Sequence, residues 1–353
     1  MPANIAHMLI AHKGLKKLQE SKNAGLAEFA GMLDSSSGKE NYQAYMNVGS
    51  VGPDLYYFIS VAKGLKDIFW DGYVQAKAVT PWAYHLHSSR PNEFALKLIE
   101  ITFSDVERKG KKVVLGVDDV RKLAYIAGHL SHIAADQIIH PLVNKIAGPY
   151  YREGKNRKTH REAEVYQDYF LYEEVYRLEK KSGPRYEFFE QDFRGWADCI
   201  RGNTLDNTEE WFRYFLQRGF IETYGSAPKE DEIEDAVDGL LLSLRASKRV
   251  GPYKKAHKEY KKGRDGPNFQ KYVRRPKYLS YYNKAVELTA VYMTALYEAY
   301  RLLKEGEDFA GKGERFLEVV SGADLSCPLE GDILGKALEV QGATGLWPER
   351  VEQ

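Results

Sequence analysis

The chain contains little cysteine and no long apolar run. Its thiols, Cys199 and Cys327, lie far apart and form no CxxC pair among the 353 residues. This argues against a thiolate zinc site or a disulfide framework, and it is compatible with a reducing cytoplasm. No window holds 18 uninterrupted apolar residues, so the sequence predicts no transmembrane helix. The N-terminus lacks a basic region and a small-residue cleavage site. We therefore expect no signal peptide and a cytoplasmic protein.

Excess charge is also missing. The 51 Lys and Arg residues balance 50 Asp and Glu, so the formal net charge is +1. The chain as a whole should attract neither nucleic acid nor an anionic membrane, and we predict no stable nucleic-acid partner. Residues 248–277 are a local exception, with twelve basic residues against two acids. We interpret them as a solvated loop; the alternative is a surface for an anionic ligand or a membrane.

Strand-like alternation is rare, and Gly-rich phosphate loops of the GxxxxGKS or GxGxxG kind are absent. Apolar residues instead recur at helical spacing, which predicts an all-α fold. We expect a turn at 49–54 that presents Asp54, and an irregular stretch that includes His85 and His87. The expected helices cover approximately 5–20, 25–33, 39–47, 93–106, 119–146, 158–178, 188–200, 206–219, 229–247 and 278–304.

Histidine is scarce but concentrated, because eight of the nine lie in the first 160 residues. His132, Asp136 and His140 are spaced at i, i+4 and i+8. On a helix this spacing drifts by only about 40° per step, so the three side chains share a face. Their neighbours are mostly apolar. Buried histidine and aspartate need partners, and a metal ion supplies them.

A second stripe consists of His160, Glu164 and Asp168 at the same spacing. His160 and Glu164 are a natural pair of zinc ligands, and His140 would make a third. The alternative is a surface helix with ion pairs between successive turns. At the N-terminus His7 and His12 do not share a helix face well, so we expect one ligand there.

Five segments carry a resemblance to a known family. In order they are AHMLIAHKGLKKL, GSVGPDLYY, HLHS, SHIAADQIIHPL and HREAE. Together they resemble the zinc-dependent phospholipase C family, which includes bacterial phospholipase C and the catalytic domain of GPI-specific phospholipase D. The family shares its all-α fold with fungal single-strand nucleases. The resemblance covers about the first 180 residues and implies up to three zinc ions.

The resemblance also implies a ligand set. His132 and Asp136 match the HxxxD element, whose aspartate bridges the first and third ions. Secreted members chelate the third ion with an N-terminal tryptophan, which this chain lacks. Removal of Met1 would expose Pro2 as a substitute ligand, or the third site would be weak or empty. The other implied ligands are Asp54 with His87 or His85 on the first ion, His140, His160 and Glu164 on the second, and His7 on the third.

The function implied is a zinc-dependent phosphodiesterase, most similar to phospholipase C, in which zinc activates water. Asp54 is the candidate general base or water-orienting residue. A phospholipid substrate and peripheral membrane contact would follow. The alternatives are a single-strand nuclease-like phosphodiesterase and a non-catalytic helical metal-binding protein. We expect the catalytic core at 1–185, added helices at 186–305 and a tail at 306–353.

Overall fold

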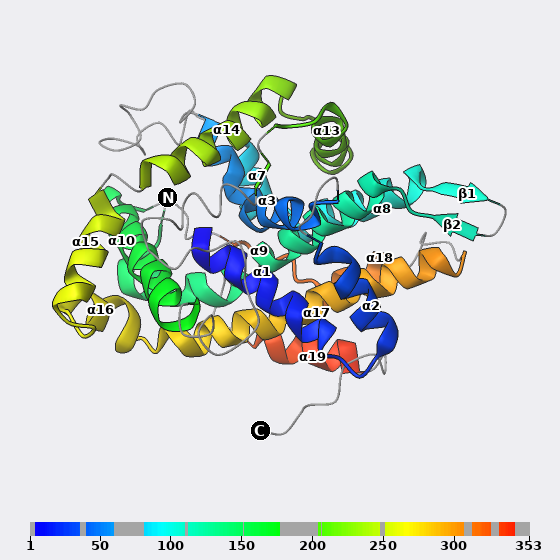
Figure 1. The fold of residues 1–353 in the computed structure, drawn as a ribbon. Coiled ribbons are helices and arrows are strands. Elements are labelled where there is room, and N and C mark those ends of the chain that lie inside the picture. The colour runs from blue at the N-terminus through cyan, green and yellow to red at the C-terminus, as the bar shows by residue number, and fades with distance from the viewer. Residues whose placement is uncertain are drawn as a thin grey trace.

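The computed structural model describes residues 4–35, 40–59, 81–109, 112–150, 152–176, 204–205, 207–247, 251–306, 313–325 and 332–342. Over these ranges the chain is helical apart from one small hairpin, so the predicted all-α fold is confirmed (Figure 1). The longer helices are α1 (Asn4–Gln19), α2 (Ala24–Leu33), α3 (Tyr42–Leu55), α8 (Pro91–Asp105), α9 (Val117–Ala147), α10 (Gly154–Phe170), α13 (Glu210–Tyr224), α14 (Glu230–Ser247), α15 (Gly251–Lys262), α17 (Tyr278–Lys304) and α19 (Ile333–Gly342).

Shorter elements connect these helices. They are α7 (Pro81–Ser88), α16 (Pro267–Phe269), α18 (Gly313–Val319), the 3₁₀ turn η1 (Tyr56–Phe58) and the π-helical turns η2 (Leu171–Tyr176) and η3 (Gln270–Arg274). Strands β1 (Glu107–Lys109) and β2 (Lys112–Val114) pair antiparallel, with Glu107 opposite Val114. No helix of the described residues is long and apolar enough to cross a membrane.

Helix α9 is the central element of the fold. Every residue from Leu123 to Gln137 is buried, and α1, α3, α8, α10 and α17 all contact the helix. A helix covered on all sides is normally apolar all round. His132 and Asp136 lie in this covered stretch, so the fold places ionisable groups in its interior.

Two glycines allow α3 and α9 to approach closely. A Cβ on Gly128 would lie 2.1 Å from the Met46 carbonyl oxygen, and a Cβ on Gly49 would lie 2.1 Å from that of Tyr125. No side chain fits at such distances. The close approach brings the Ser50 carbonyl oxygen within 2.9 Å of His132 Nδ1.

The prediction of a turn at 49–54 was wrong, because this segment forms the last part of α3, with Pro53 inside the helix. Pro53 removes one backbone hydrogen bond near the end of α3, where the chain passes into the 3₁₀ turn η1. Gly49 serves close packing against α9 rather than a turn. His85 and His87 lie in α7 and not in an irregular stretch. Pro81 is the first residue of this helix, a position that proline favours.

The basic run was also predicted incorrectly as a loop. It contains α15, α16 and η3. Tyr253, Ala256, Phe269 and Tyr272 are buried, and these elements contact α10. The aromatic residues interleaved with the lysines therefore form the apolar side of an amphipathic segment. The helix expected at 188–200 lies outside the described residues.

Candidate metal centre

Three groups of His, Asp and Glu side chains converge within the described residues. In each group the potential ligand atoms all lie within 4.8 Å of one another. They come from α1, α3, α7, α9 and α10, which are far apart in the sequence. The groups are His7 with His132 and Asp136, Asp54 with His87 and His132, and His140 with His160 and Glu164.

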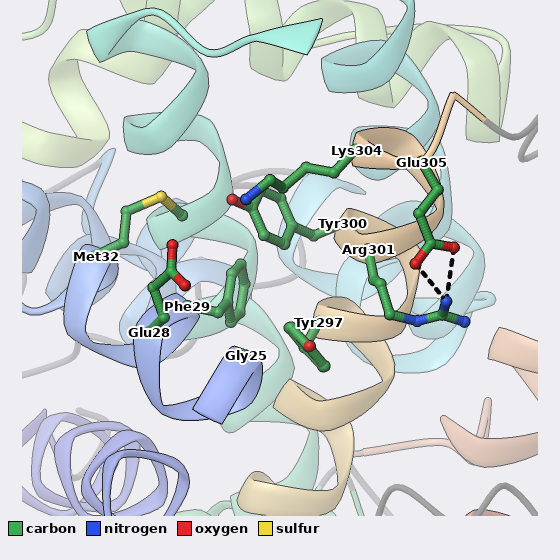
Figure 2. A pocket seen from close by; sticks show the side chains of 9 residues that line it. All are labelled: Gly25, Glu28, Phe29, Met32, Tyr297, Tyr300, Arg301, Lys304 and Glu305. Atoms are coloured by element: carbon green, nitrogen blue, oxygen red, sulfur yellow. Dashed lines mark hydrogen bonds and ion pairs between the residues drawn. The ribbon is translucent and has the colours of Figure 1, made fainter. Parts of the chain in front are cut away.

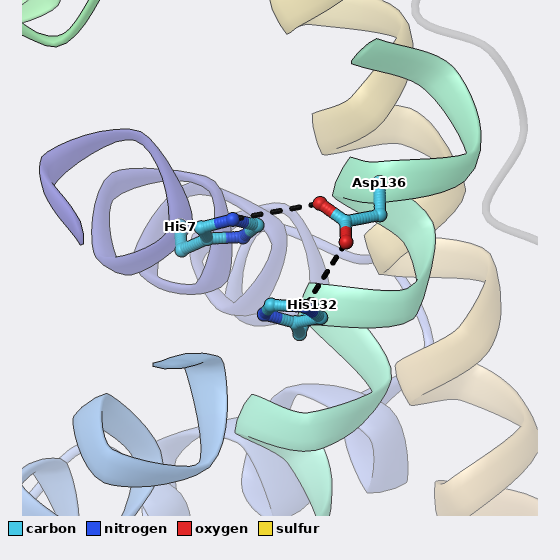
Figure 3. Close-up of side chains that lie close together, drawn as sticks. All are labelled: His7, His132 and Asp136. Atoms are coloured by element: carbon cyan, nitrogen blue, oxygen red, sulfur yellow. Dashed lines mark ion pairs between the residues drawn. The ribbon is translucent and has the colours of Figure 1, made fainter. Parts of the chain in front are cut away.

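Asp136 lies at the centre of this arrangement. Its Oδ1 is 3.5 Å from His7 Nε2 and 3.4 Å from His140 Nε2. Its Oδ2 is 3.1 Å from His132 Nε2 and 3.8 Å from His87 Nε2. Figure 3 shows the carboxylate facing His7 and His132. Burial raises the pKa of Asp136, but the charges of His140 and His132 outweigh it and hold the pKa well below its usual range.

Three of the histidines have the same ring orientation. The Nδ1 atoms of His132, His87 and His140 lie 2.9, 2.6 and 2.5 Å from the carbonyl oxygens of Ser50, Ala83 and Leu325. A carbonyl oxygen only accepts, so each Nδ1 carries a proton and donates it. In the neutral ring Nε2 then bears the lone pair, and it faces a carboxylate. Metal-binding histidines are typically oriented in this way.

The donor atoms fit zinc. His132 Nε2 and Asp136 Oδ2 are buried and lie 3.1 Å apart, and neither has another hydrogen-bond partner among the described residues. A lone pair and a carboxylate oxygen pointed at one another are satisfied by a cation or a proton. Imidazole nitrogens with carboxylate oxygens are the ligands of non-thiolate zinc sites. These residues are therefore suited to zinc.

His7 is in the form that binds a metal. Its ring stacks on that of His132, with centroids 4.2 Å apart, so both rings approach Asp136 side by side. Burial, reinforced by the positive charge of His132, lowers the pKa of His7 to about 4. The imidazole is consequently neutral at physiological pH. Pro2, the other ligand expected from the N-terminus, lies outside the described residues.

Asp54 is an ionised carboxylate on α3. Its Oδ1 is 3.1 Å from His87 Nε2, and its Oδ2 is 4.0 Å from His7 Nε2. Burial raises the pKa of Asp54, but its interaction with the His87 side chain and the charge of His132 hold the pKa below the usual range. The carboxylate is therefore available to bind a cation or to accept a hydrogen bond.

The third group lies between α9 and α10. Glu164 Oε1 is 3.0 Å from His160 Nε2 and 3.7 Å from His140 Nε2. Burial lowers the pKa of His140, but Asp136 and Glu164 together raise it to about 10. Without a metal, His140 thus holds a proton in the position where a cation would otherwise satisfy the carboxylates.

Asp168, the last residue of the second stripe, has a different role. Its carboxylate accepts hydrogen bonds from the backbone N–H groups of Ile5 and Ala6, at 3.3 and 2.8 Å, and from the Tyr253 hydroxyl at 2.7 Å. It belongs to none of the three groups. By capping the start of α1, Asp168 fixes the turn that carries His7. Helical spacing alone did not distinguish this capping role from that of a ligand.

The structure distinguishes between His85 and His87. Two residues apart on a helix, their side chains point about 200° apart. His87 turns into the site, whereas the ring of His85 stacks on Tyr224 with centroids 5.1 Å apart and joins none of the groups. His12 is likewise outside the groups, and its Nε2 is 2.8 Å from Asn47 Oδ1.

A cavity of about 420 Å³ lies between α2 and the C-terminal part of α17 (Figure 2). Phe29 and Tyr300 contribute to its lining, and Arg301 and Glu305 pair at its edge at 2.7 Å. None of the residues that line it belongs to the three metal groups. The cavity is therefore separate from the candidate centre.

One comparison with known proteins gives a match. The model of the family described as zinc-dependent phospholipase C matches residues 6–230, which include every member of the three groups. No curated protein and no solved structure matches the chain.

Proposed function

Because the chain belongs to the zinc-dependent phospholipase C family, we propose that it hydrolyses phosphodiesters and that a phospholipid is its substrate. The observation that carries this proposal is the convergence of donor atoms from five helices into three groups, with the buried carboxylate of Asp136 facing histidines of α1, α7 and α9. Hydrolysis at a zinc cluster needs ligands that are fixed before substrate arrives. The carbonyl-bound rings of His87, His132 and His140 meet that need.

Each of the three groups would hold one zinc ion. We assign Asp54, His87 and His132 to one ion, His140, His160 and Glu164 to a second, and His7 with Asp136 to a third. Asp136 would bridge two of them, because its two oxygens face different histidines. When bound, zinc supplies a water of lowered pKa and neutralises the charge of the phosphoryl oxygens.

We assign the handling of the attacking water to Asp54. Its carboxylate is ionised because its pKa is lowered. It can accept a hydrogen bond from a water and hold that water in line with the phosphorus atom. Its other oxygen would bind the ion that it shares with His87 and His132, so the carboxylate would not rotate freely. No covalent nucleophile is needed.

Peripheral membrane contact would bring the centre to its substrate. Four lysines of α15, Lys254, Lys255, Lys258 and Lys262, line a groove of about 510 Å³. All four are exposed. Lysines near an anionic bilayer each contribute about 1 kcal/mol of attraction. We propose that this face lies against the membrane, on the cytoplasmic side that the two isolated cysteines favour.

The substrate class can be tested directly. We would measure hydrolysis of a short-chain phosphatidylcholine and of single-stranded DNA, each before and after chelation and re-addition of zinc. The proposal expects lipid hydrolysis that chelation abolishes and zinc restores. Cleavage of DNA alone would identify a nuclease, and zinc binding with neither activity would identify a metal-binding protein.

A matched pair of variants links the activity to the centre. His87→Gln should reduce lipid hydrolysis by at least a hundredfold, because one group loses a ligand. His85→Gln, two residues earlier on the same helix, should retain activity, since its ring packs on Tyr224. Equal activity of the two variants would refute the assignment.

A further inference from the structure

A segment far from the matched region contacts two of the histidines. The Leu325 carbonyl oxygen accepts the hydrogen bond from His140 Nδ1 at 2.5 Å. The Leu325 N–H donates to the His87 carbonyl oxygen at 2.8 Å. The two histidines belong to different metal groups and different helices. Leu325 is itself fully buried and lies 95 residues beyond the end of the family match at residue 230.

The preceding residues are held by a closed ring of three hydrogen bonds. The Tyr292 hydroxyl donates to Gln137 Oε1 at 2.6 Å, and Gln137 Nε2 donates to the Ser321 carbonyl oxygen at 2.8 Å. The Ser321 N–H then donates to the Tyr292 hydroxyl at 3.2 Å. The Tyr292 hydroxyl, the Gln137 amide and the Ser321 backbone each donate one hydrogen bond and accept one. This pattern fixes the orientation of the Gln137 amide.

Gln137 joins this ring to the metal centre. It follows Asp136 directly on α9 and precedes His140 by less than one turn. Its side chain is buried, as is that of Tyr292. The Gln137 amide makes one hydrogen bond to Ser321 in this segment and one to Tyr292 on α17, so Gln137 ties the segment to both α9 and α17.

Two further contacts fix the ends of the segment. Asn92 Nδ2 on α8 donates to the Val320 carbonyl oxygen at 2.8 Å. The Ser88 hydroxyl on α7 donates to Asp324 Oδ1 at 2.9 Å. Residues 320–325 are therefore attached to α7, α8, α9 and α17.

We propose that residues 320–325, which we name the C-terminal strap, position the centre, an inference that rests on the proposed metal-dependent function. The strap holds the His140 ring with Nε2 facing Asp136 and Glu164. It also fixes the last turn of α7, which carries His87. The Leu325 carbonyl takes the part that carboxylates and carbonyls behind metal-bound histidines commonly take. Tyr292 and Gln137 are positioning residues, because they act through the strap.

Tyr292→Phe tests the strap with little change of shape. It removes the hydroxyl that links Gln137 to Ser321 and leaves the ring in place. Tyr300→Phe is the matched control, since Tyr300 is on the same helix and lies at the cavity of Figure 2. Both variants should keep the wild-type circular dichroism spectrum.

Two measurements separate the strap from the proposed function. In the zinc-free protein, NMR hydrogen exchange of the His140 Nδ1–H reports the bond to Leu325 directly. Zinc affinity, from competition with a chromophoric chelator, reports the centre. Tyr292→Phe should speed the exchange and lower zinc affinity at one site by about tenfold. Tyr300→Phe should change neither.

The outcomes are distinct. Unchanged exchange and unchanged zinc affinity in Tyr292→Phe would overturn the strap. Faster exchange in a protein that binds no zinc even as wild type would support the strap and refute the metal centre.

Gln137→Met should have the same effect as Tyr292→Phe. The double variant should lose little more zinc affinity than either single variant, because both substitutions break the same ring of hydrogen bonds. Fully additive losses would count against the proposal.

Discussion

At the scale of single residues, the site depends on which atom of each histidine carries a proton. The spacing predicted that His132, Asp136 and His140 share one helix face, and the structure confirms it, because both histidines approach Asp136 along α9. The sequence could not show that the carbonyl groups of Ser50 and Leu325 fix the rings of His132 and His140. These acceptors are backbone atoms from distant segments, and no side-chain pattern encodes them.

Proton release on zinc binding tests this arrangement. The pKa of His140 is raised to about 10 without metal, so the ring is protonated at pH 8. Zinc must displace that proton, and its affinity should therefore rise as the pH increases from 6 to 9. Titration of zinc into weakly buffered, metal-free protein at pH 8 should acidify the solution. Binding without proton release would contradict the proposed protonation of His140.

Asp168 provides a second prediction at this scale. Asp168→Asn replaces one acceptor oxygen with a donor that opposes the N–H groups of α1. We expect a loss of about 1 kcal/mol in the free energy of unfolding, as for a removed helix cap. Urea denaturation measures this loss. Zinc binding at the His140 group should persist in the same variant, whereas its loss there would assign Asp168 a ligand role.

At the scale of elements, the centre depends on how closely α3 approaches α9. The sequence showed Gly49 and Gly128 but gave no sign that they face another backbone, and the first was interpreted as part of a turn. The approach itself brings Asp54 and Ser50 to α9. Periodicity predicts which face of a helix is buried, but not the distance between two helices.

Gly128→Ala should disturb this approach. The added methyl group would lie 2.1 Å from the Met46 carbonyl oxygen, so α3 must move away. We expect a loss of about 1–3 kcal/mol in the free energy of unfolding together with weaker zinc binding. Gly31→Ala on α2 is the control, because its Cβ meets nothing within 4 Å and should stabilise the helix by up to about 1 kcal/mol. Equal stability of the two variants would contradict close packing.

At the scale of the whole molecule, the family was predictable because five segments that resemble its motifs occur in a fixed order. The helical class was predictable because apolar residues recur at helical spacing. The contribution of the C-terminal region was not. Its strap contacts the site through backbone groups and through Gln137, Tyr292 and Asn92, residues that have no distinctive spacing. The basic run was misjudged for a related reason. Its aromatic residues are buried against α10, which the local charge concealed.

The central claim is that one buried carboxylate, Asp136, organises a zinc cluster. Elemental analysis of the protein purified without added zinc tests it most directly, with wild type compared to Asp136→Asn. We predict two to three zinc ions per chain for the wild type, one for each occupied group. The variant should lose at least one ion while its helical circular dichroism spectrum is retained. A wild-type protein that holds no stoichiometric metal, or a variant with the same zinc content, would contradict the account.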